Sequence, residues 1–546
     1  MGVALLVFLV SLGARLNGID LYSTTDEGYW MQRSTRFGAA LARGDVAATY
    51  RAGHPGVTVM WVGLLGMGPA GLTPFLPERL ARIDVLERAP TYLQAFSDAR
   101  RAVAVLASVL VAASVMLSWR LFGQGAALAG GALLVLDPYV IGMTRLLHVD
   151  ALLAPLMLVS VLAGLVYWTR SRHWPYLALS AATGGLAMLT KAPAALLPLL
   201  FGLVCAAELW RARRTGASTR SQVLAQLLVW GLIATGVYVV LFPAMWVDPA
   251  GRIQTLIAFV AAVGLEPHNG NFFLGRPVMN DPGPLYYAVA LPLRMSPMVA
   301  LGLALLVLPA PTQEHRAAVR WLLAYVVLFI FMMTVASKKF DRYMLPALMA
   351  LDLLAGVGLW RLTMLTMEKL RISGARVVVQ ALALAAVLAA GQVFLLMRVW
   401  PYPIAYYSPL SGGPDRARDL IMVGWGEGLE QVADFLNRLP DAEQLSVVTS
   451  YNHVMRPRFR GVTLPIAPYL RGAAGLPTPD YIVLYVNGVQ RQQTSPEVEI
   501  ARSNGPPVFI ARVNGQDYAW VYEMPRTGPR PAQPDTIEDG GDSEET

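Results

Sequence analysis

Two adjacent acids near the N-terminus, Asp26 and Glu27, are the first side chains in the chain that could do chemistry. A carboxylate held at a helix start can act as a general base, taking a proton from an attacking group. Thr24 and Glu27 also have the spacing of a capping box, in which Glu27 only closes the first helical turn. Capping and catalysis are compatible, so this segment predicts a helix start that holds a carboxylate rigidly.

A second acid, Asp150, lies two residues after His148 at the start of an apolar segment. An acid there costs less free energy than one at the bilayer centre, so a helix cap facing lipid headgroups would also explain it. His54 lies beside a Pro-Gly pair, and a plain turn would have the same composition. Asp150 is a candidate catalytic residue, and His54 and His148 are candidate substrate-binding residues.

Three bases stand close together in the segment Ser337–Tyr343, a short loop that we place outside the membrane. The positive-inside rule predicts few bases there. An anionic partner would offset them, and a lipid phosphate suits the charge-assisted donors of Lys338, Lys339 and Arg342. Asp341 could instead pair with one of these bases, or the loop could bind anionic headgroups in general.

Two further bases are weaker candidates for the same site. Lys191 is another base that we place outside, at the end of an apolar segment. Arg276 lies in a long outside loop among other polar residues, where loop structure alone would explain it.

These residues stand out because charge is scarce in this chain. Of its 546 residues, 55% are hydrophobic and 15% are charged, whereas a soluble protein has about 25% charged residues. The net charge of +8 does not indicate nucleic acid as a partner, because Lys and Arg lie mostly at the ends of apolar runs. The composition excludes an ordinary cytosolic enzyme and predicts a chain that lies largely within a lipid bilayer.

The elements that must position the candidates are therefore membrane helices, which need about 20 apolar residues each. We expect a mainly α, polytopic protein. A signal-peptide core is the rival interpretation of its first, short span, although no basic region precedes it. About 11 transmembrane helices are expected, at residues 2–14, 100–118, 124–143, 149–168, 175–190, 192–210, 223–246, 284–309, 320–336, 343–362 and 377–399.

With a cytoplasmic N-terminus, these spans alternate so that every inside loop contains Arg or Lys. Tryptophans mark many span ends, as an aromatic belt at the membrane surface requires. The pattern predicts a multi-pass plasma (inner) membrane protein. It also places Asp26, Asp150 and the loop at 337–343 together on the extracytoplasmic side.

Three outside segments are too long to be plain connectors. Within a transmembrane catalytic domain at residues 1–399, we expect interfacial helices in the first outside loop (15–98). We expect another in the second long outside loop (247–283), near Arg252–Gly264. Residues 400–525 should form a small soluble α/β domain outside the membrane, with β-rich runs that include 445–450, 481–487 and 507–514. The acidic tail at 526–546 should be disordered.

Several familiar motifs fail on inspection. Residues 66–71 match G-x-G-x-x-G but are followed by Leu72-Thr73-Pro74 rather than a helix, so we reject dinucleotide binding. The chain contains no P-loop and no Asp-x-Asp pair, which argues against ATP-driven transport and against a metal-bound nucleotide sugar. The single Cys205 excludes an internal disulfide framework.

The order of the remaining motifs resembles the GT-C glycosyltransferases. Within that class, it resembles the bacterial type of the branch that contains the dolichyl- or polyprenyl-phosphate-mannose protein mannosyltransferases and the lipid A aminoarabinose transferase. The resemblance covers about residues 1–440. It rests on Asp26-Glu27, His54-Pro55-Gly56, His148-Val149-Asp150, Lys191-Ala192-Pro193, Lys338 to Pro346 and Gly424-Trp425-Gly426-Glu427-Gly428.

The resemblance implies an inverting glycosyltransferase with a polyprenyl-phosphate sugar donor and a lipid, glycan or protein acceptor on the outer face. Asp26 would be the general base, and Glu27 would be either a catalytic partner or only its capping neighbour. Asp150 would orient the acceptor or Asp26, or bind a divalent metal with Asp26; no other cofactor is implied. The phosphate would be held by Lys338, Lys339, Arg342, Tyr343 and Lys191.

A polytopic lipid or glycolipid transporter, such as a flippase, is the alternative. A transporter would show polar residues near the span centres and two halves related as inverted repeats. The sequence shows neither: no repeat is visible, and Asp352, the notable acid within a span, could be a structural partner in the tenth span. A non-catalytic membrane anchor would leave the basic loop unexplained. The glycosyltransferase hypothesis requires that Asp26, Asp150 and Arg342 converge on one outward-facing cavity with a lateral opening to lipid.

Overall fold

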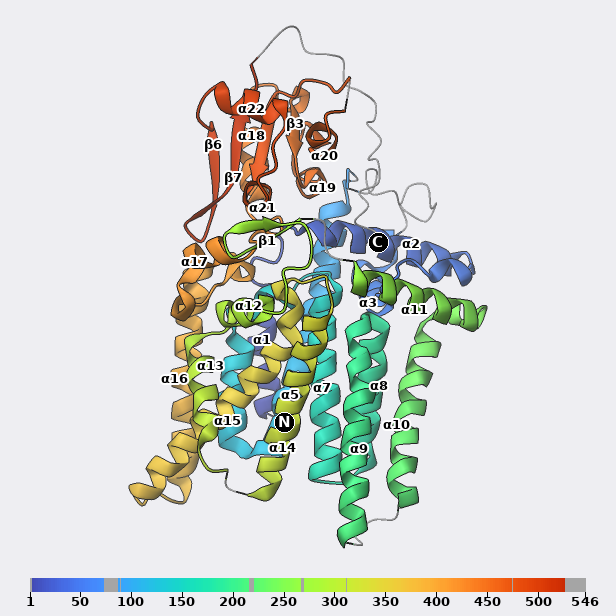
Figure 1. Ribbon diagram of the computed structural model, residues 1–546, viewed down its shortest axis with the longest axis vertical. Helices are drawn as coiled ribbons and strands as arrows, with labels where there is room; N and C mark the ends of the chain where they lie inside the picture. The colour runs from blue at the N-terminus through green and yellow to red at the C-terminus, as the bar shows by residue number, and fades with distance from the viewer. Residues whose placement is uncertain are drawn as a thin grey trace.

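Apolar helices that run side by side make up most of the molecule (Figure 1). The computed structural model describes residues 2–72, 87–88, 90–215, 220–266, 270–310, 312–473 and 475–525. Long runs of Leu, Val and Ala give these helices apolar surface on almost every side, to be buried in one another or exposed to lipid. The bundle contains α1 (Gly2–Leu16), α5 (Tyr92–Leu136), α6 (Pro138–Met143), α7 (Val149–Thr169), α8 (Trp174–Thr190), α9 (Leu196–Thr215), α10 (Arg220–Leu241), α12 (Tyr286–Arg294), α13 (Pro297–Ala304), α14 (Gln313–Val335), α15 (Leu345–Lys369) and α16 (Ala375–Val399).

Each of the eleven expected spans corresponds to helix in this bundle, but fewer helices are long enough to cross a membrane by themselves. Seven helices of the described chain are long and apolar enough, or eight if the bent pair α12 and α13 is one span. That pair turns by 113°. The short α1 has 15 residues, α8 has 17, and α5 covers two of the expected spans.

The long helix α5 is a hairpin of two helices joined at Gly123, whose φ of 80° is unusual inside a helix. A Cβ atom on Gly131 would lie 3.0 Å from Cγ1 of Val115. In one straight helix these residues would be about 24 Å apart along the axis. The two halves of α5 therefore pack against each other, and the chain returns to the end of the bundle from which it came.

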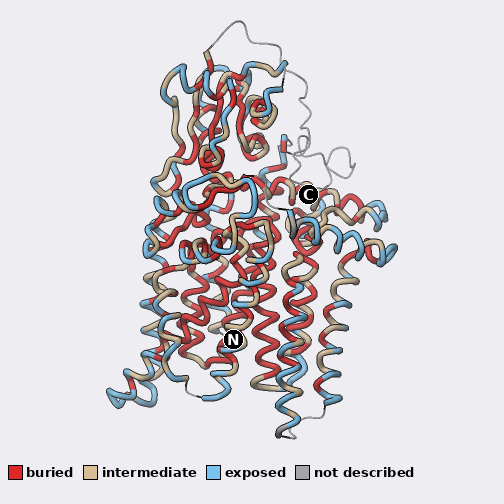
Figure 2. The backbone as a smooth tube through the Cα atoms, in the orientation of Figure 1, coloured by how far each residue is buried: buried red, intermediate tan, exposed pale blue. Residues whose placement is uncertain are grey.

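At the centre of the bundle lies α7, in which every residue from Val149 to Trp168 is buried. Helices α5, α8 and α15 pack around it. Helices α10 and α16 lie at the edge and expose apolar side chains such as Leu228 and Phe394 (Figure 2). A buried helix at the centre and apolar helices at the rim are the arrangement expected of a multi-pass membrane protein.

Helices that lie across the bundle cover one end of it (Figure 1). They are α2 (Thr25–Ala42) and α11 (Pro249–Leu265), beside the shorter α3 (Val57–Leu72). A small antiparallel hairpin, β1 (Asn271–Phe273) and β2 (Arg276–Val278), lies at the same end. Helix α11 matches the interfacial helix expected near Arg252–Gly264.

Beyond this end stands a small sheet domain (Figure 1). Its five strands have the order β4-β3-β5-β7-β6, with parallel pairing on the β4 side and antiparallel pairing on the β6 side. Along β5, Tyr481, Val483 and Tyr485 belong to the main core, whereas Ile482 and Leu484 pack on the opposite face. The elements of this region are α17 (Gly413–Leu420), α18 (Leu429–Leu436), β3 (Ser446–Thr449), α19 (Asn452–Met455), β4 (Val462–Pro465), α20 (Ala467–Leu470), β5 (Tyr481–Tyr485), α21 (Val486–Gln490), α22 (Pro496–Ser503), β6 (Phe509–Val513) and β7 (Gln516–Glu523).

The expected fold class, a mainly α polytopic bundle with a small α/β C-terminal domain, is confirmed. Helix α16 ends at Val399, and the domain boundary at 399/400 stays a prediction. Two strands were not among the expected β-rich runs: β4, and β7, which has eight residues. The expected disordered tail at 526–546 lies outside the described residues.

Candidate active site

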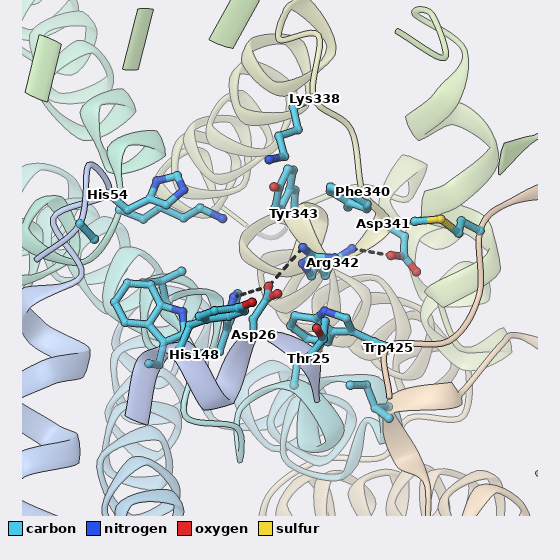
Figure 3. Close-up of a pocket in the computed structure, with 18 of the residues that line it drawn as sticks. Thr25, Asp26, His54, His148, Lys338, Phe340, Asp341, Arg342, Tyr343 and Trp425 are labelled. Carbon is cyan, nitrogen blue, oxygen red and sulfur yellow. Dashed lines mark hydrogen bonds and ion pairs between the residues drawn. The ribbon is translucent and has the colours of Figure 1, made fainter. Parts of the chain in front are cut away.

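A polar cavity of about 470 Å³ lies where the covered end of the bundle meets the sheet domain (Figure 3). Its wall combines the start of α2, the segment before α3, the start of α7, the short helix η7 (Asp341–Met344) and the loop before α18. The charged side chains of this wall are Asp26, Arg33, Arg51, Lys191, Arg294, Lys338, Asp341, Arg342, Glu427 and Arg491.

Asp26 lies in the first turn of α2 and faces the cavity, with 32% of its side chain exposed. Its Oδ2 atom is 3.3 Å from Nε2 of His148 and 3.5 Å from Nη2 of Arg342. Burial alone would raise the pKa of Asp26, but the hydrogen bond from His148 and the charge of Arg342 outweigh burial and hold it well below the usual range. Asp26 is therefore a carboxylate at neutral pH.

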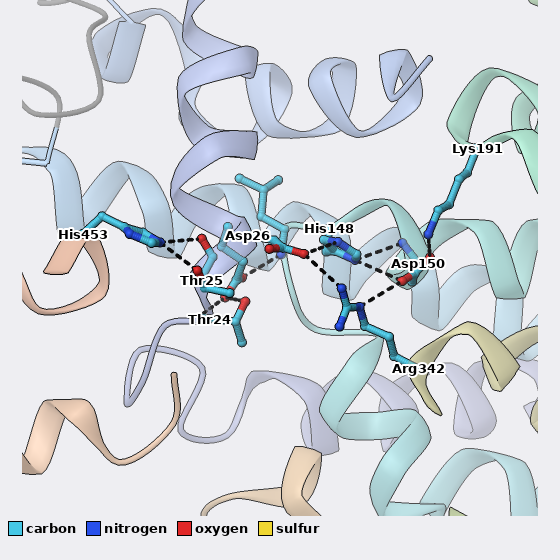
Figure 4. Close-up of polar contacts among 10 residues, drawn as sticks. Thr24, Thr25, Asp26, His148, Asp150, Lys191, Arg342 and His453 are labelled. Carbon is cyan, nitrogen blue, oxygen red and sulfur yellow. Dashed lines mark hydrogen bonds and ion pairs between the residues drawn. The ribbon is translucent and has the colours of Figure 1, made fainter. Parts of the chain in front are cut away.

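Asp150, in the first turn of α7, lies directly behind the cavity wall with 3% of its side chain exposed (Figure 4). It contacts three groups that do line the cavity. Its Oδ1 accepts a hydrogen bond from Nζ of Lys191 at 2.7 Å. Its Oδ2 is 3.7 Å from Nε of Arg342 and 3.6 Å from Nδ1 of His148. Asp150 thus fixes the positions of two cations and one imidazole.

Arg342 links the two acids, since its guanidinium contacts both Asp26 and Asp150. Aromatic rings hold it in place: its Cζ is 4.2 Å from the ring centre of Phe340 and 4.4 Å from that of Trp425. The neighbouring Asp341 does not neutralise the basic loop. It pairs instead with Arg294 of α12, at 2.6 Å.

Other expected residues complete this wall. Lys338 and Tyr343 line the cavity, and Nζ of Lys191 lies 4.1 Å from the ring centre of Tyr343. His54 lines it from the segment before α3 and packs against Phe259 of α11. Burial, and then the charges of Lys191 and Arg33, lower the pKa of His54 to about 3, so its imidazole is neutral.

Besides Asp150, three expected site residues do not line the cavity. Glu27 is fully buried, and its carboxylate accepts hydrogen bonds from Arg100, from the backbone of Leu147 and from Thr24, as a capping box requires. Lys339 points away from its neighbour Lys338, because successive side chains of an extended loop alternate. Its Nζ is buried on Asp281 at 2.6 Å and on the carbonyl of Ala336.

The third is Arg276, which is exposed on β2 and does not line the cavity. Its position at the end of a hairpin matches the alternative explanation, loop structure. The geometry also does not favour a metal shared by Asp26 and Asp150, because Arg342 and His148 already lie between them. Among the described residues, no three His, Cys, Asp or Glu side chains are grouped as a metal site would need.

Aromatic residues and arginines supply the part of the wall that sequence reasoning missed. Their approach depends on the tertiary fold, because they come from distant segments: Arg33 from α2, Arg51 from the segment before α3, Arg294 from α12, and Arg491 from the sheet domain. One feature of the sequence could have indicated Trp425 and Glu427 as site residues. They lie in the run Gly424–Gly428, whose alternating glycines predict an unusual backbone conformation.

Part of the chain is similar in sequence to a known protein family. Residues 92–242 match the family model of the dolichyl-phosphate-mannose-protein mannosyltransferases. The match runs from α5 to the end of α10, so it includes Asp150 and Lys191. No curated protein sequence matches the chain.

Among solved structures, the chain is similar to ArnT from Cupriavidus metallidurans bound to undecaprenyl phosphate. The TM-score is 0.50 at 15% identity, over 95% of this chain and 98% of that one. The chain has the GT-C fold. Apo ArnT from the same organism gives a TM-score of 0.49 at 17% identity, over the same shares of both chains. The oligosaccharyltransferase AglB from Archaeoglobus fulgidus, in complex with an inhibitory peptide and a dolichol-phosphate, gives 0.43 at 11%, over 95% of this chain and 74% of that one.

The expected resemblance to the ArnT and protein mannosyltransferase branch of the GT-C glycosyltransferases is thereby confirmed. The structure brings together the three residues on which the glycosyltransferase hypothesis depends. Asp26, Asp150 and Arg342 form one connected network, and that network lies at one cavity (Figure 4).

Proposed function

We propose that this protein is an inverting glycosyltransferase that moves a sugar from a polyprenyl-phosphate donor to an acceptor at the extracytoplasmic face of the membrane. The observation that carries the proposal is the arrangement of one guanidinium, Arg342, between the carboxylates Asp26 and Asp150 at a cavity wall. Group transfer needs a base and a stabiliser of the leaving group close together, and this network supplies both.

Asp26 would take the proton. It is ionised, faces the cavity and is fixed by α2, so it can accept the proton of an acceptor hydroxyl or amine as that group attacks C1 of the sugar. Its low pKa makes it a weak base at rest. A donor phosphate that draws Arg342 toward itself would weaken the Arg342–Asp26 contact and raise the proton affinity of Asp26 when it is needed.

The cations of the wall would stabilise the leaving phosphate. As the new bond to C1 forms, the bond between C1 and the phosphate oxygen breaks, and the electron pair leaves with the phosphate. Arg342, Lys338 and Lys191 line the cavity and can balance that charge, with Tyr343 as a hydrogen-bond donor. Asp150 and His148 would act as positioning residues, because they hold Lys191, Arg342 and Asp26.

Two comparisons support a lipid-linked donor. The matching family model describes enzymes that use dolichyl-phosphate mannose, and the similar fold of ArnT was solved with undecaprenyl phosphate. The charge pattern supports the sidedness: the end of α9, the start of α10 and the connection from α15 to α16, which we expect inside, lie at the end away from the sheet domain (Figure 1). A lipid, a glycan or a protein would be the acceptor.

The test is a transfer assay with the purified full-length protein in lipid nanodiscs, undecaprenyl-phosphate mannose and total envelope extract as acceptor. We expect sugar transfer in the absence of nucleotide sugars, with inversion of the anomeric centre by NMR. Undecaprenyl-phosphate glucose and galactose serve as further donors. A protein that moves these lipids between leaflets of a vesicle without breaking the C1–oxygen bond would instead be the transporter.

A further inference from the structure

The loop between α17 and α18, residues 424–428, has a backbone that only glycine adopts readily. Its sequence is Gly-Trp-Gly-Glu-Gly, and the three glycines have φ values of 86°, 115° and 92°. Left-handed conformations at alternate positions fix the directions of the two side chains between them, Trp425 and Glu427. The conformation of the loop therefore sets the directions of these two side chains.

This loop packs against the start of α2, the helix that carries Asp26. The carbonyl of Trp425 accepts a hydrogen bond from the backbone N–H of Thr25 at 3.0 Å. A Cβ atom on Gly426 would lie 2.9 Å from the carbonyl oxygen of Ser23. Close approach of two backbones fixes Trp425 and Glu427 in relation to Asp26, and the ring of Trp425 also contacts Arg342.

Glu427 differs from the other carboxyl groups of the cavity wall. Asp26 contacts Arg342, and Asp341 contacts Arg294. In the part of the chain that the structure describes, no Lys or Arg lies within ion-pair distance of Glu427. Its hydrogen bonds come from backbone groups, chiefly from the N–H of Trp425 to Oε2 at 2.8 Å.

A buried carboxyl group without a cation is costly unless something else uses it. Glu427 is 3% exposed and is one of the residues that line the cavity. Burial raises its pKa to about 7, so both the acid and the carboxylate are populated at neutral pH. The charged and titratable groups that face it are Arg294 of α12, Glu430 of α18, Tyr485 of β5, Tyr518 of β7, and Tyr22, Tyr402 and Tyr407 of the connecting segments.

We propose that Glu427 binds a ring hydroxyl of the sugar that is transferred, and so helps to select that sugar. This inference rests on the proposed function. A sugar joined to the donor phosphate must lie directly beside it, and the phosphate would lie at Arg342. The loop places Glu427 two residues from the ring that contacts Arg342, in the same wall.

The chemistry of the group fits a sugar hydroxyl better than a phosphate. A hydroxyl both donates and accepts hydrogen bonds, so it can pair with Glu427 as carboxylate or as acid. A phosphate would be repelled by the carboxylate form. The cations for a phosphate lie on the other segments of the wall, at Lys191, Lys338 and Arg342.

The experiment measures the dissociation constants of the purified full-length protein in nanodiscs for four lipids. They are undecaprenyl phosphate and its mannose, glucose and galactose derivatives. The ratio of the sugar-free constant to the sugar-bearing one gives the contribution of the sugar. We expect Glu427→Ala to reduce this ratio about tenfold for the preferred sugar, the cost of one hydrogen bond to a charged group. Binding of undecaprenyl phosphate should stay unchanged.

Two further variants separate recognition from folding. Glu427→Gln keeps an oxygen for the N–H of Trp425, so the loop should stay intact. The ratio between the constants of the preferred and the weakest-bound sugar lipid, both phosphodiesters that do not titrate in this range, should vary between pH 6 and pH 8 in the wild type and become independent of pH in Glu427→Gln. Glu430→Gln is the matched control, since Glu430 is also a buried carboxyl but does not line the cavity. It should leave the ratio unchanged.

Three results would overturn the inference: an unchanged ratio in Glu427→Ala, an equal loss of affinity for all four lipids, or equal affinities of the wild type for all four. If the wild type does not bind undecaprenyl phosphate at all, the proposed function fails as well. If undecaprenyl phosphate binds and only the ratio fails to respond, the proposed function stands and the role of Glu427 falls.

Discussion

At the scale of single residues, the site depends on a guanidinium that serves two carboxylates. Arg342 reaches Asp26 with one nitrogen and Asp150 with another, and Phe340 and Trp425 fix its plane. A planar group with several donors is needed for this, which an ammonium cannot replace. The chemistry proposed here therefore belongs to Arg342 as much as to Asp26.

We predict that Arg342→Lys lowers kcat by about 100-fold or more, which is the usual cost of removing one stabiliser of a developing negative charge. Protein yield and melting temperature should stay close to those of the wild type. Arg276→Lys is the matched control on an exposed arginine outside the cavity, and it should be fully active. Equal activity of both variants would contradict the role of Arg342.

The pH dependence of kcat offers a second test at this scale. His148 and Arg342 hold the pKa of Asp26 below its usual range, so the base form persists well into the acid range. In His148→Gln, one of these influences is removed and the pKa of Asp26 rises. With saturating donor, the acid limb of the kcat profile should move to higher pH. A limb that stays in place, or moves to lower pH, would mean that Asp26 is not the titrating base.

The limits of sequence reasoning are clear at this scale. Lys338 and Lys339 are equivalent in the sequence, yet one lines the cavity and the other is buried on Asp281. The spacing of Thr24 and Glu27 correctly indicated a capping box at this helix start, but it left open whether Glu27 also lines the site. Such choices depend on the direction of a side chain, and that direction follows from contacts distant in sequence.

At the scale of elements, the site is built where three helix starts meet one loop. The starts of α2, α7 and η7 bring Asp26, Asp150 and Arg342 together. A buried ion pair joins α2 to α5. Both carboxylate oxygens of Glu27 accept hydrogen bonds from Arg100, which also donates one to the carbonyl of Ile19. This pair is a structural prerequisite for the position of Asp26.

We expect Glu27→Ala to destabilise the protein by about 3–5 kcal/mol, because it leaves a buried arginine without its partner. Asp98→Ala, which removes an exposed pair with Arg101, should cost at most about 1 kcal/mol. Reversible unfolding in mixed micelles, followed by circular dichroism, compares the two. A smaller loss for Glu27→Ala than for Asp98→Ala would contradict the structural role of Glu27.

The loop at 424–428 allows a backbone test. Gly426→Ala adds a methyl group at a φ of 115° and brings it within 2.9 Å of the carbonyl of Ser23. Gly515→Ala adds one at a φ of 81° where no other atom lies within 4 Å. Both variants should lose some stability through backbone strain. Only Gly426→Ala should also lower kcat, since it moves the loop away from α2.

The sequence predicts helices well where a long apolar run defines them. Long apolar runs correctly predicted the helices of the bundle. The two spans expected at 100–118 and 124–143 correspond to the two halves of α5, and the chain turns between them at Gly123. The strands were harder to predict. Strand β7 carries Gln516, Asp517 and Glu523 in a mixed pattern, and its pairing with both β5 and β6 is a tertiary property that local sequence does not encode.

At the scale of the whole molecule, charge is sorted between two ends. Arginines of the connections hold the far end together: Arg170 contacts Glu314 and the carbonyl of Leu121, and Arg172 contacts Glu208. The opposite end carries the cavity and the sheet domain (Figure 1). The few charged residues of the chain thus form two sets. We expect one set to determine the membrane topology and the other to form the site.

Sidedness can be measured directly, because the chain has one cysteine and it is buried. In a Cys205→Ser background, Gly472→Cys places a thiol on the sheet domain, and Arg371→Cys places one at the far end, between α15 and α16. A membrane-impermeant maleimide added to intact cells should label the first and not the second. Labelling of Arg371→Cys alone would reverse the proposed orientation.

The turnover of Asp26→Asn is the most direct measurement of the central claim, that Asp26 is the base of a lipid-linked sugar transferase. With undecaprenyl-phosphate sugar as donor, kcat should fall by at least about 100-fold, while undecaprenyl phosphate still binds. Asp20→Asn, on an exposed acid shortly before α2, should retain full turnover. Undiminished turnover in Asp26→Asn would contradict the claim.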